Sequence, residues 1–348
     1  MTRPMRLGSL CTGIGGLEHG LTLAGLDTDT VFVSDIDKGA CAWLEANMPN
    51  TPNLGDFTEL NELPEVDILT AGFPCQPVSN AGLRAGINDE RWLFDDITRL
   101  VGRMGSRPYV FLENVPGLLT ANNGNAMARV VHGLAGIGYH ITYGTLSASA
   151  VGAPHRRLRW WGLAFHADSV AGPTAGERTD RTGRKPEVYG TNTGLVRDVA
   201  DALGAGQQQS WTQTDQTGRG RSAGRSGGVA ADADSFAAGR NSGATLSSQE
   251  QARRQPHSGD RPRNGDRRAE FGQYADAVHQ WGCLLGRTAP HPTINGRLAP
   301  PFVEWMMGYP EGWVTDTLTS RRQALHALGN AVVPQCAAAA FQQLTARL

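Results

Sequence analysis

The sequence has little lysine, no paired cysteines and no long apolar segment. Lys38 and Lys185 are the only lysines among the 32 basic residues, so the others are arginines. The planar guanidinium of arginine suits phosphate and guanine edges, but the codon usage of a GC-rich genome produces the same excess. A net charge of −1 also lacks the basic excess that is typical of nucleic-acid-binding proteins. Composition therefore leaves nucleic-acid binding open.

The five cysteines are odd in number, scattered, and never spaced as Cys-x-x-Cys. This pattern favours neither a disulfide framework nor a zinc site, and we expect no metal. The chain has no apolar run of about 18 residues, as a membrane-spanning helix requires, and residues 1–6 lead into strand-like sequence rather than a secretory signal. We therefore expect an intracellular protein without a membrane partner, large enough for two domains.

Short apolar runs of strand length alternate with stretches of helical length in the first half of the chain. The strand-like runs are residues 7–11, 31–35, 68–71, 109–113 and 159–165, and the helical stretches are residues 17–24, 39–47, 93–102 and 126–134. This alternation predicts an α/β fold with a doubly wound, mostly parallel sheet. Ligands of such sheets bind at the carboxyl ends of the strands.

A glycine-rich loop and an acidic residue follow the first two predicted strands. The loop, residues 11–16, precedes a helix, and its glycines allow a ligand to approach the backbone and the helix N-terminus. The second strand ends in Asp35, which we expect to bind ribose hydroxyls, whereas Asp37 is expected to cap the next helix. Glu18 stands where the dinucleotide pattern G-x-G-x-x-G needs its third glycine. The glycine-rich loop and Asp35 by themselves fit NAD and S-adenosylmethionine equally well as ligands.

Two residues whose side chains can take part in a reaction stand at the ends of the third and fourth predicted strands. Cys75 follows Pro74 just after the apolar run at residues 66–71, and Glu113 ends the apolar run at residues 110–112. A cysteine presented to a ligand crevice can act as a nucleophile, although an isolated cysteine is more often a small buried hydrophobe. An apolar site raises the pKa of a glutamate and allows it to act as an acid, although an isolated glutamate is more often exposed.

Two arginines two positions apart precede the last predicted strand of this half. Side chains at such positions point to the same face, so we expect Arg157 and Arg159 to reach the crevice. There they can hold a carbonyl group of a ligand and lower the pKa of a thiol. Their neighbour Arg156 is expected to be solvated or to contact phosphate.

The order of these motifs resembles that of the DNA (cytosine-5) methyltransferase family. It runs from the glycine-rich loop and the acid through Pro-Cys-Gln, Glu-Asn-Val and Arg-x-Arg to the ninth and tenth motifs at residues 301–313 and 328–334. The resemblance covers residues 5–166 and 297–340, and it favours S-adenosylmethionine over NAD as the cofactor. It implies the S-adenosylmethionine-dependent methyltransferase fold.

The resemblance also implies a role for individual residues. The catalytic residues would be Cys75, Glu113, Arg157 and Arg159. The cofactor would be held by Cys11, Thr12, Gly13, Gly15, Gly16, Asp35, Ile36, Asp56, Phe57, Pro74, Asn330 and Ala331. Two positions depart from the family pattern: Cys11 replaces a phenylalanine that packs on the cofactor and offers less apolar area, and His155 replaces a glutamine but keeps a hydrogen-bond donor.

The implied activity is methyl transfer from S-adenosylmethionine to carbon 5 of a cytosine that has been rotated out of double-stranded DNA, through a covalent adduct with Cys75. Double-stranded DNA is the expected partner, and a restriction endonuclease of a restriction-modification system is a candidate second partner. We expect a monomer in the cytoplasm of a bacterial or phage-infected cell, near the nucleoid. The alternatives are a tRNA cytosine-5 methyltransferase and a catalytically silent nucleic-acid-binding module.

The domain boundaries follow from the motifs and from a region poor in apolar residues. Between residues 168 and 270, nine residues are Leu, Ile, Val or Phe and sixteen are Gly, which is too little apolar material for a core. We predict a catalytic and cofactor-binding domain at residues 1–167, completed by residues 320–348. Residues 168–319 form the target-recognition region, with a partly disordered insert at about 168–270. After the insert, apolar residues from Phe271 to Leu285 recur at helical spacing and predict a helix with one face in the core.

Overall fold

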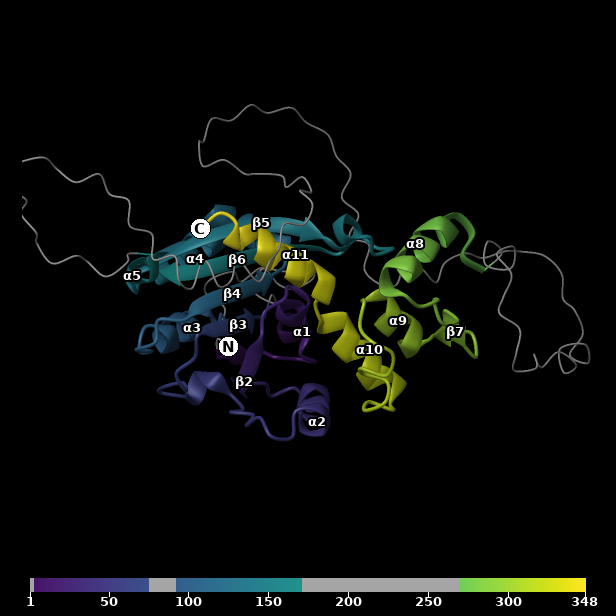
Figure 1. The fold of residues 1–348 in the computed structure, drawn as a ribbon, viewed down its shortest axis with the longest axis horizontal. Coiled ribbons are helices and arrows are strands. Elements are labelled where there is room, and N and C mark those ends of the chain that lie inside the picture. The colour runs from purple at the N-terminus through teal and green to yellow at the C-terminus, as the bar shows by residue number, and fades with distance from the viewer. Residues whose placement is uncertain (1–2, 75–91, 171–269) are drawn as a thin grey trace, which may run out of the picture.

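The computed structural model describes residues 3–74, 92–170 and 270–348, and these contain a six-stranded central sheet (Figure 1). Cys75 and most of the predicted insert lie outside the described residues. The strand order is β2-β1-β3-β4-β6-β5; β1 to β4 pair in parallel, whereas β6 pairs antiparallel with both β4 and β5. The prediction of a mostly parallel sheet is therefore confirmed. The strands are β1 (Met5–Leu10), β2 (Thr28–Phe32), β3 (Ile68–Gly72), β4 (Tyr109–Asn114), β5 (Tyr139–Ser147) and β6 (Leu158–His166).

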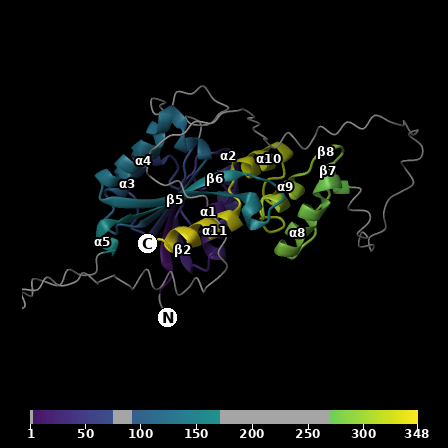
Figure 2. The same ribbon diagram turned by 90° about the horizontal axis from the view of Figure 1, so that it is seen from above.

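Helices cover both faces of this sheet (Figure 2). Side chains alternate along β4, so that Phe111 joins the core beneath α1 and α11, whereas Val110 and Leu112 join the core beneath α3 and α4. A strand buried on both faces reads as a continuous apolar run, which explains why β4 was recognisable in the sequence. The helices of these layers are α1 (Gly16–Leu23), α2 (Lys38–Asn47), α3 (Phe94–Val101), α4 (Asn125–Gly136), α10 (Arg321–Asn330) and α11 (Pro334–Thr345).

The structure differs from the sequence prediction at two strands. Strand β2 ends at Phe32 rather than at Asp35, because the chain beyond it turns away to pair Val33 with Asn53 in an isolated parallel bridge. Strand β5 was not predicted. It lies at the edge of the sheet, its residues are mostly half-buried, and it contains Gly144 among polar residues, so it lacks an apolar run and a clear alternation.

A second group of elements follows the undescribed residues: α8 (Ala275–Leu285), the two short strands β7 (Thr293–Ile294) and β8 (Arg297–Leu298), and α9 (Pro300–Met306). Val278 and Trp281 of α8 are buried, and the Trp281 indole donates to the Trp305 carbonyl at 3.0 Å. The predicted core-facing helix is thus confirmed over Ala275–Leu285, whereas Tyr274, which the spacing placed on its apolar face, precedes the helix and is 44% exposed. Its buried residues belong to the same apolar cluster as those of α1 and α11, and the division of the chain into two domains remains a prediction.

The C-terminal helices return to the sheet. Residues 321–345 have the length and composition of a membrane span, but 61% of that window is buried inside the protein. The chain also leaves the helical conformation at Ala331 before α11 begins. Burial against α1 and the sheet is the pattern of a core helix. The turn between α10 and α11, at residues 329–331, lies beside the carboxyl ends of the strands.

Candidate active site

The loop after β1 adopts a left-handed backbone at three positions. The φ angles are 53° at Cys11, 60° at Gly13 and 69° at Gly15. A Cβ atom at Gly13 would meet no atom within 4 Å, so the positive φ rather than lack of space favours glycine there. At Gly16 the reason is packing, because a Cβ atom would collide with the Tyr309 hydroxyl. The loop therefore needs its glycines for two different reasons.

Asp35, three residues beyond the end of β2, fixes this loop. Its Oδ2 accepts a hydrogen bond from the Gly13 amide at 2.8 Å, and its Oδ1 accepts one from the Asp37 amide at 2.8 Å. Burial raises the pKa of the Asp35 carboxyl, against the effect of these hydrogen bonds. Asp37 caps α2 through the amides of Gly39 and Ala40, as predicted.

The surroundings of Cys11 bring the two predicted cofactor acids together. Burial is the main cause that raises the pKa of the Cys11 thiol to about 12, and the charges of Asp35 and Asp56 add to it. The thiol is therefore neutral, and the carboxyl groups of both acids lie close enough to affect its pKa. The residue after Asp35, Ile36, is 69% exposed. Two acceptors beside an open apolar side chain and a bare glycine backbone fit a nucleoside with its hydroxyl and amino groups.

Two of the predicted cofactor residues have structural partners instead. The Thr12 side chain is buried; its hydroxyl donates to the Ser9 carbonyl at 3.3 Å and accepts from the Ser34 amide at 3.2 Å. Phe57 is buried in the core beneath α3, so its ring points away from the crevice surface. Any contact of these two residues with a cofactor would come from their backbone.

Glu113 and Arg159 form a mostly buried ion pair between the end of β4 and the start of β6. The Arg159 Nε lies 3.0 Å from the Glu113 Oε1, and the side chains are 20% and 12% exposed respectively. Burial raises the pKa of the Glu113 carboxyl, while the charges of Arg159 and Arg157 oppose this rise. A carboxyl with a raised pKa beside a guanidinium can hold a proton and yet be kept in one orientation.

Arg157, in contrast, is directed to the C-terminal segment. Its Nη2 donates to the Gly329 carbonyl at 2.7 Å and also to the Ala331 carbonyl. Burial is the main cause that lowers its pKa to about 10, so Arg157 remains charged at neutral pH. Its hydrogen bonds bracket Asn330, whose side chain is exposed and approaches His326 at 3.5 Å. Arg157 thus positions the residues expected to close the cofactor site.

The segment that leads to Cys75 is fixed up to Pro74. The Asn114 side chain donates to the Phe73 carbonyl at 3.2 Å, and Gly72 of β3 lies opposite Glu113 of β4. A Cβ atom at Gly72 would lie 3.7 Å from the Glu113 Oε2 and 3.9 Å from the Cys11 carbonyl oxygen. Gly72 is therefore the point where the glycine-rich loop, Glu113 and the chain toward Cys75 meet.

Aromatic residues that the sequence did not single out hold the glycine-rich loop from outside. The Trp313 indole donates to the Ile14 carbonyl at 2.8 Å, and its ring packs at 5.4 Å from Trp43 and 5.7 Å from Tyr309. The Trp43 indole in turn donates to the Trp313 carbonyl. No local sequence pattern predicts these contacts, because Trp313 lies about 300 positions from the loop that it holds.

A buried carboxylate fixes the turn that carries Trp313. Both oxygens of Glu304 accept hydrogen bonds, from the amides of Gly312, Val314 and Thr315 at 2.7–2.9 Å. His155 ties the same region to β6, since its Nε2 lies 3.1 Å from the Met306 carbonyl. Burial is the main cause that lowers the His155 pKa to about 4, so this ring is neutral and donates.

Comparisons with known proteins agree with this arrangement. A family profile described as C-5 cytosine-specific DNA methylase matches residues 5–346. The chain is 41% identical over 163 residues to the type II methyltransferase M.BsuFI of Bacillus subtilis, an alignment that covers 46% of this chain and 39% of that protein. It is 31% identical over 226 residues to M1.ScrFI of Lactococcus lactis subsp. cremoris, with 63% and 57% covered. These alignments span less than two thirds of the relatives.

Solved structures extend the likeness to the whole chain. The Dnmt2 methyltransferase of S. pombe superposes with a TM-score of 0.51 at 16% identity, and the Entamoeba histolytica methyltransferase EhMeth with 0.54 at 14%. Each comparison covers 99% of both chains. At such low identity the likeness concerns the fold alone, and it confirms the predicted methyltransferase fold.

Proposed function

Because this chain belongs to the family of C-5 cytosine-specific DNA methylases, we propose that it transfers a methyl group from S-adenosylmethionine to carbon 5 of cytosine in double-stranded DNA. The observation that carries the proposal is the buried pair of Glu113 and Arg159 opposite Gly72, three residues before Cys75. An acid with a raised pKa beside the strand end of a nucleophile is the equipment that this reaction needs.

Carbon 5 of cytosine is too weak a nucleophile to accept a methyl group unaided, so the ring is activated covalently. The Cys75 thiolate adds to carbon 6, the electron pair of the 5,6 double bond forms a double bond between carbons 4 and 5, and the pair of the 3,4 double bond takes up a proton that Glu113 donates to nitrogen 3. Arg159 holds Glu113 and is the candidate donor to the base carbonyl. When carbon 5 has gained the methyl group, the 3,4 double bond re-forms and nitrogen 3 returns its proton to Glu113. Carbon 5 then loses its own proton to a base; the electrons of that bond re-form the 5,6 double bond, and the bond between carbon 6 and sulfur breaks to release the thiolate. S-adenosylmethionine supplies the methyl group when bound.

The residues around Cys11 fit this cofactor. Asp35 and Asp56 offer carboxylate acceptors for hydroxyl and amino groups, and the exposed Ile36 offers an apolar surface for a flat ring. Asn330 and Ala331, placed by Arg157, would close the site from the C-terminal side. We keep Gly13, Gly15, Gly16 and Pro74 as further candidate contacts; Cys11 offers only a small, neutral side chain to the cofactor.

Double-stranded DNA would lie across the target-recognition region at residues 168–319. A cavity of about 570 Å³ supports this. It lies between two described elements of this region, the β7–β8 hairpin and α9, and the start of α10 in the catalytic domain, and it is lined by Asn295, Arg297 and Arg321 among apolar side chains. Cationic side chains beside an apolar hollow suit a DNA strand. The target cytosine must leave the stack to reach Glu113, which costs a few kcal/mol.

The domain division and the partners remain part of the proposal. Deleting residues 172–262, outside the described part, should leave a protein that binds S-adenosylmethionine, because the candidate cofactor residues all lie outside the deletion. The relatives of this chain are named type II methyltransferases. These names support a restriction endonuclease as a functional partner. We propose a monomeric enzyme of the bacterial cytoplasm.

The activity can be tested directly. Purified protein is incubated with tritiated S-adenosylmethionine and, in separate reactions, with unmethylated plasmid DNA or tRNA. Host DNA after expression is sequenced for 5-methylcytosine. Label at carbon 5 of cytosine at a fixed DNA sequence is the expected result. Label in tRNA but not in DNA would refute the proposed substrate, and binding of DNA without any transfer would indicate a catalytically silent module.

A further inference from the structure

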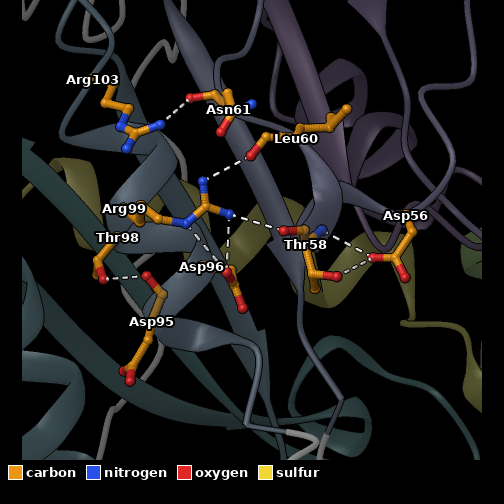
Figure 3. A network of polar contacts seen from close by, with 9 residues as sticks. All are labelled: Asp56, Thr58, Leu60, Asn61, Asp95, Asp96, Thr98, Arg99 and Arg103. Atoms are coloured by element: carbon orange, nitrogen blue, oxygen red, sulfur yellow. Dashed lines mark hydrogen bonds and ion pairs between the residues drawn. The ribbon is translucent and has the colours of Figure 1, made fainter.

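Arg99 of α3 fastens this helix to the turn that follows Asp56 (Figure 3). Its Nη1 donates to the Leu60 carbonyl at 2.7 Å, and its Nη2 donates to the Thr58 carbonyl at 3.1 Å. Asp96, one turn earlier on α3, accepts from the Arg99 Nε at 3.3 Å and from its Nη2 at 2.9 Å. All three nitrogens of the guanidinium are engaged, in a geometry that the single ammonium of lysine cannot reproduce.

Thr58 transmits this anchorage to Asp56. The Asp56 Oδ1 accepts hydrogen bonds from the Thr58 amide at 2.9 Å and from the Thr58 hydroxyl at 2.7 Å (Figure 3). Thr58 is therefore held from two sides, by Asp56 through its amide and hydroxyl and by Arg99 through its carbonyl. The orientation of the Asp56 carboxylate depends on Thr58, and the position of Thr58 depends on Arg99.

The first turn of α3 packs on the strand end that leads to Cys75. The Phe94 ring lies 5.2 Å from the Phe73 ring, and Trp92 lies 6.2 Å from the same ring. All three are buried. Helix α3 thus packs at its beginning on the segment before Cys75, and near its end it holds the turn with Asp56.

We propose that Arg99 is a positioning residue for the methyl donor: through Thr58 it orients Asp56 for S-adenosylmethionine. The inference rests on the proposed function. The bonds from Arg99 order this turn through the protein's own contacts, so its conformational entropy is lost on folding and does not weaken binding.

The test compares Arg99→Lys with Arg103→Lys. Arg103 is a matched control, since it lies four residues further on, is exposed, and donates to the neighbouring Asn61 carbonyl at 2.7 Å. Three quantities are measured: the dissociation constant of S-adenosylmethionine by calorimetry, kcat at saturating cofactor, and hydrogen exchange of the amides of residues 58–61 in the cofactor-free protein. Thermal unfolding is recorded for each variant.

Arg99→Lys should raise the dissociation constant about tenfold, the scale of one hydrogen bond to a charged group, and accelerate exchange at residues 58–61. Turnover at saturating cofactor should stay within about twofold, because the catalytic groups are untouched. Arg103→Lys should change the dissociation constant by less than about twofold, within the scatter of surface substitutions. The split between affinity and turnover separates positioning from general destabilisation.

A double-mutant cycle decides whether Asp56 is the intermediary. In an Asp56→Ala background, Arg99→Lys should have no further effect on cofactor affinity. An undiminished effect there, equal affinities for the two lysine variants, or unchanged exchange at residues 58–61 would overturn the inference. If the wild-type protein itself failed to bind S-adenosylmethionine, the proposed function would be refuted together with the role inferred for Arg99.

Discussion

The glycine-rich loop and the Glu113 end of β4 meet at Gly72, but different interactions hold them. The loop is held by left-handed backbone angles, by the Gly13 amide on Asp35 and by the Trp313 indole on the Ile14 carbonyl. Glu113 is held by a buried charge pair with Arg159. The left-handed backbone, the indole hydrogen bond and the ring packing keep their geometry over a wide pH range, and the Asp35 carboxyl is a titrating group of the loop half. The Glu113 pair, in contrast, depends on charge on both partners, and its carboxyl changes charge as it titrates.

This contrast separates the expected effects of substitutions. Changes in the loop half should weaken cofactor binding and leave turnover at saturation intact. Changes in the Glu113 half should lower turnover or move its pH dependence and leave cofactor affinity intact. Substitutions on each side therefore test whether the two halves of the site act separately.

The largest effect is expected from Cys75→Ser, at the position that the sequence assigns to the nucleophile. A neutral hydroxyl is a far poorer nucleophile than a thiolate, so methyl transfer should fall by about four orders of magnitude or more. Tritium transfer measures the rate, and calorimetry should show unchanged cofactor binding. DNA that contains 5-fluorocytosine should trap the wild-type protein but not the variant; trapping of the variant would point to another nucleophile.

Glu113→Gln should lower turnover by about 10²–10⁴-fold, the usual scale of general acid catalysis, with an unchanged dissociation constant for the cofactor. The wild-type pH profile offers a second check. Since burial raises the pKa of Glu113, its acid form persists to higher pH than that of an exposed carboxyl, and turnover should fall as the pH rises through this raised value. In the glutamine variant the falling limb should disappear. A loss of cofactor affinity with intact turnover would place Glu113 in the other half of the site.

Arg159→Gln should shift the pH at which turnover falls. The charge of Arg159 lowers the pKa of Glu113, so its removal should raise the pKa further and shift the falling limb to higher pH. Turnover at the optimum should fall about tenfold, as expected when a hydrogen bond to a charged group is lost. Arg156→Gln is the control, because Arg156 is an exposed neighbour. Equal shifts in both variants would show a general effect of surface charge instead of a specific pair.

The strand ends were predictable because a strand buried on both faces is a continuous apolar run in the sequence, and the polar residue with a functional role comes directly after that run. Glu113 after residues 110–112 and Asp37 before α2 are examples, since each signal lies within a few residues of its structural consequence. The ion pair between Glu113 and Arg159 required one further step, the pairing of β4 with β6, and the side-chain types alone did not determine it.

Residues that act on distant backbone carbonyls could not be predicted. Arg99 donates to carbonyls about 40 positions away, and Arg157 to carbonyls more than 170 positions away. Every residue offers a carbonyl, so the acceptor leaves no mark in the sequence. Arg157 was expected in the crevice beside Arg159; the structure places its hydrogen bonds on Gly329 and Ala331 at the C-terminal segment.

The smallest effect, and the sharpest comparison, is expected from Trp313→Phe. This change keeps an aromatic ring against Trp43 but removes the hydrogen bond from the indole to the Ile14 carbonyl, which is worth about 1 kcal/mol and so about fivefold in cofactor affinity. Trp281→Phe is the matched control, because it removes a similar bond to the Trp305 carbonyl within the helical region. Both variants should unfold at a somewhat lower temperature, but only Trp313→Phe should weaken S-adenosylmethionine binding at unchanged kcat. If the two variants lost affinity equally, the loop would owe its order to the stability of the whole fold, and the contrast between the two halves of the site would not hold.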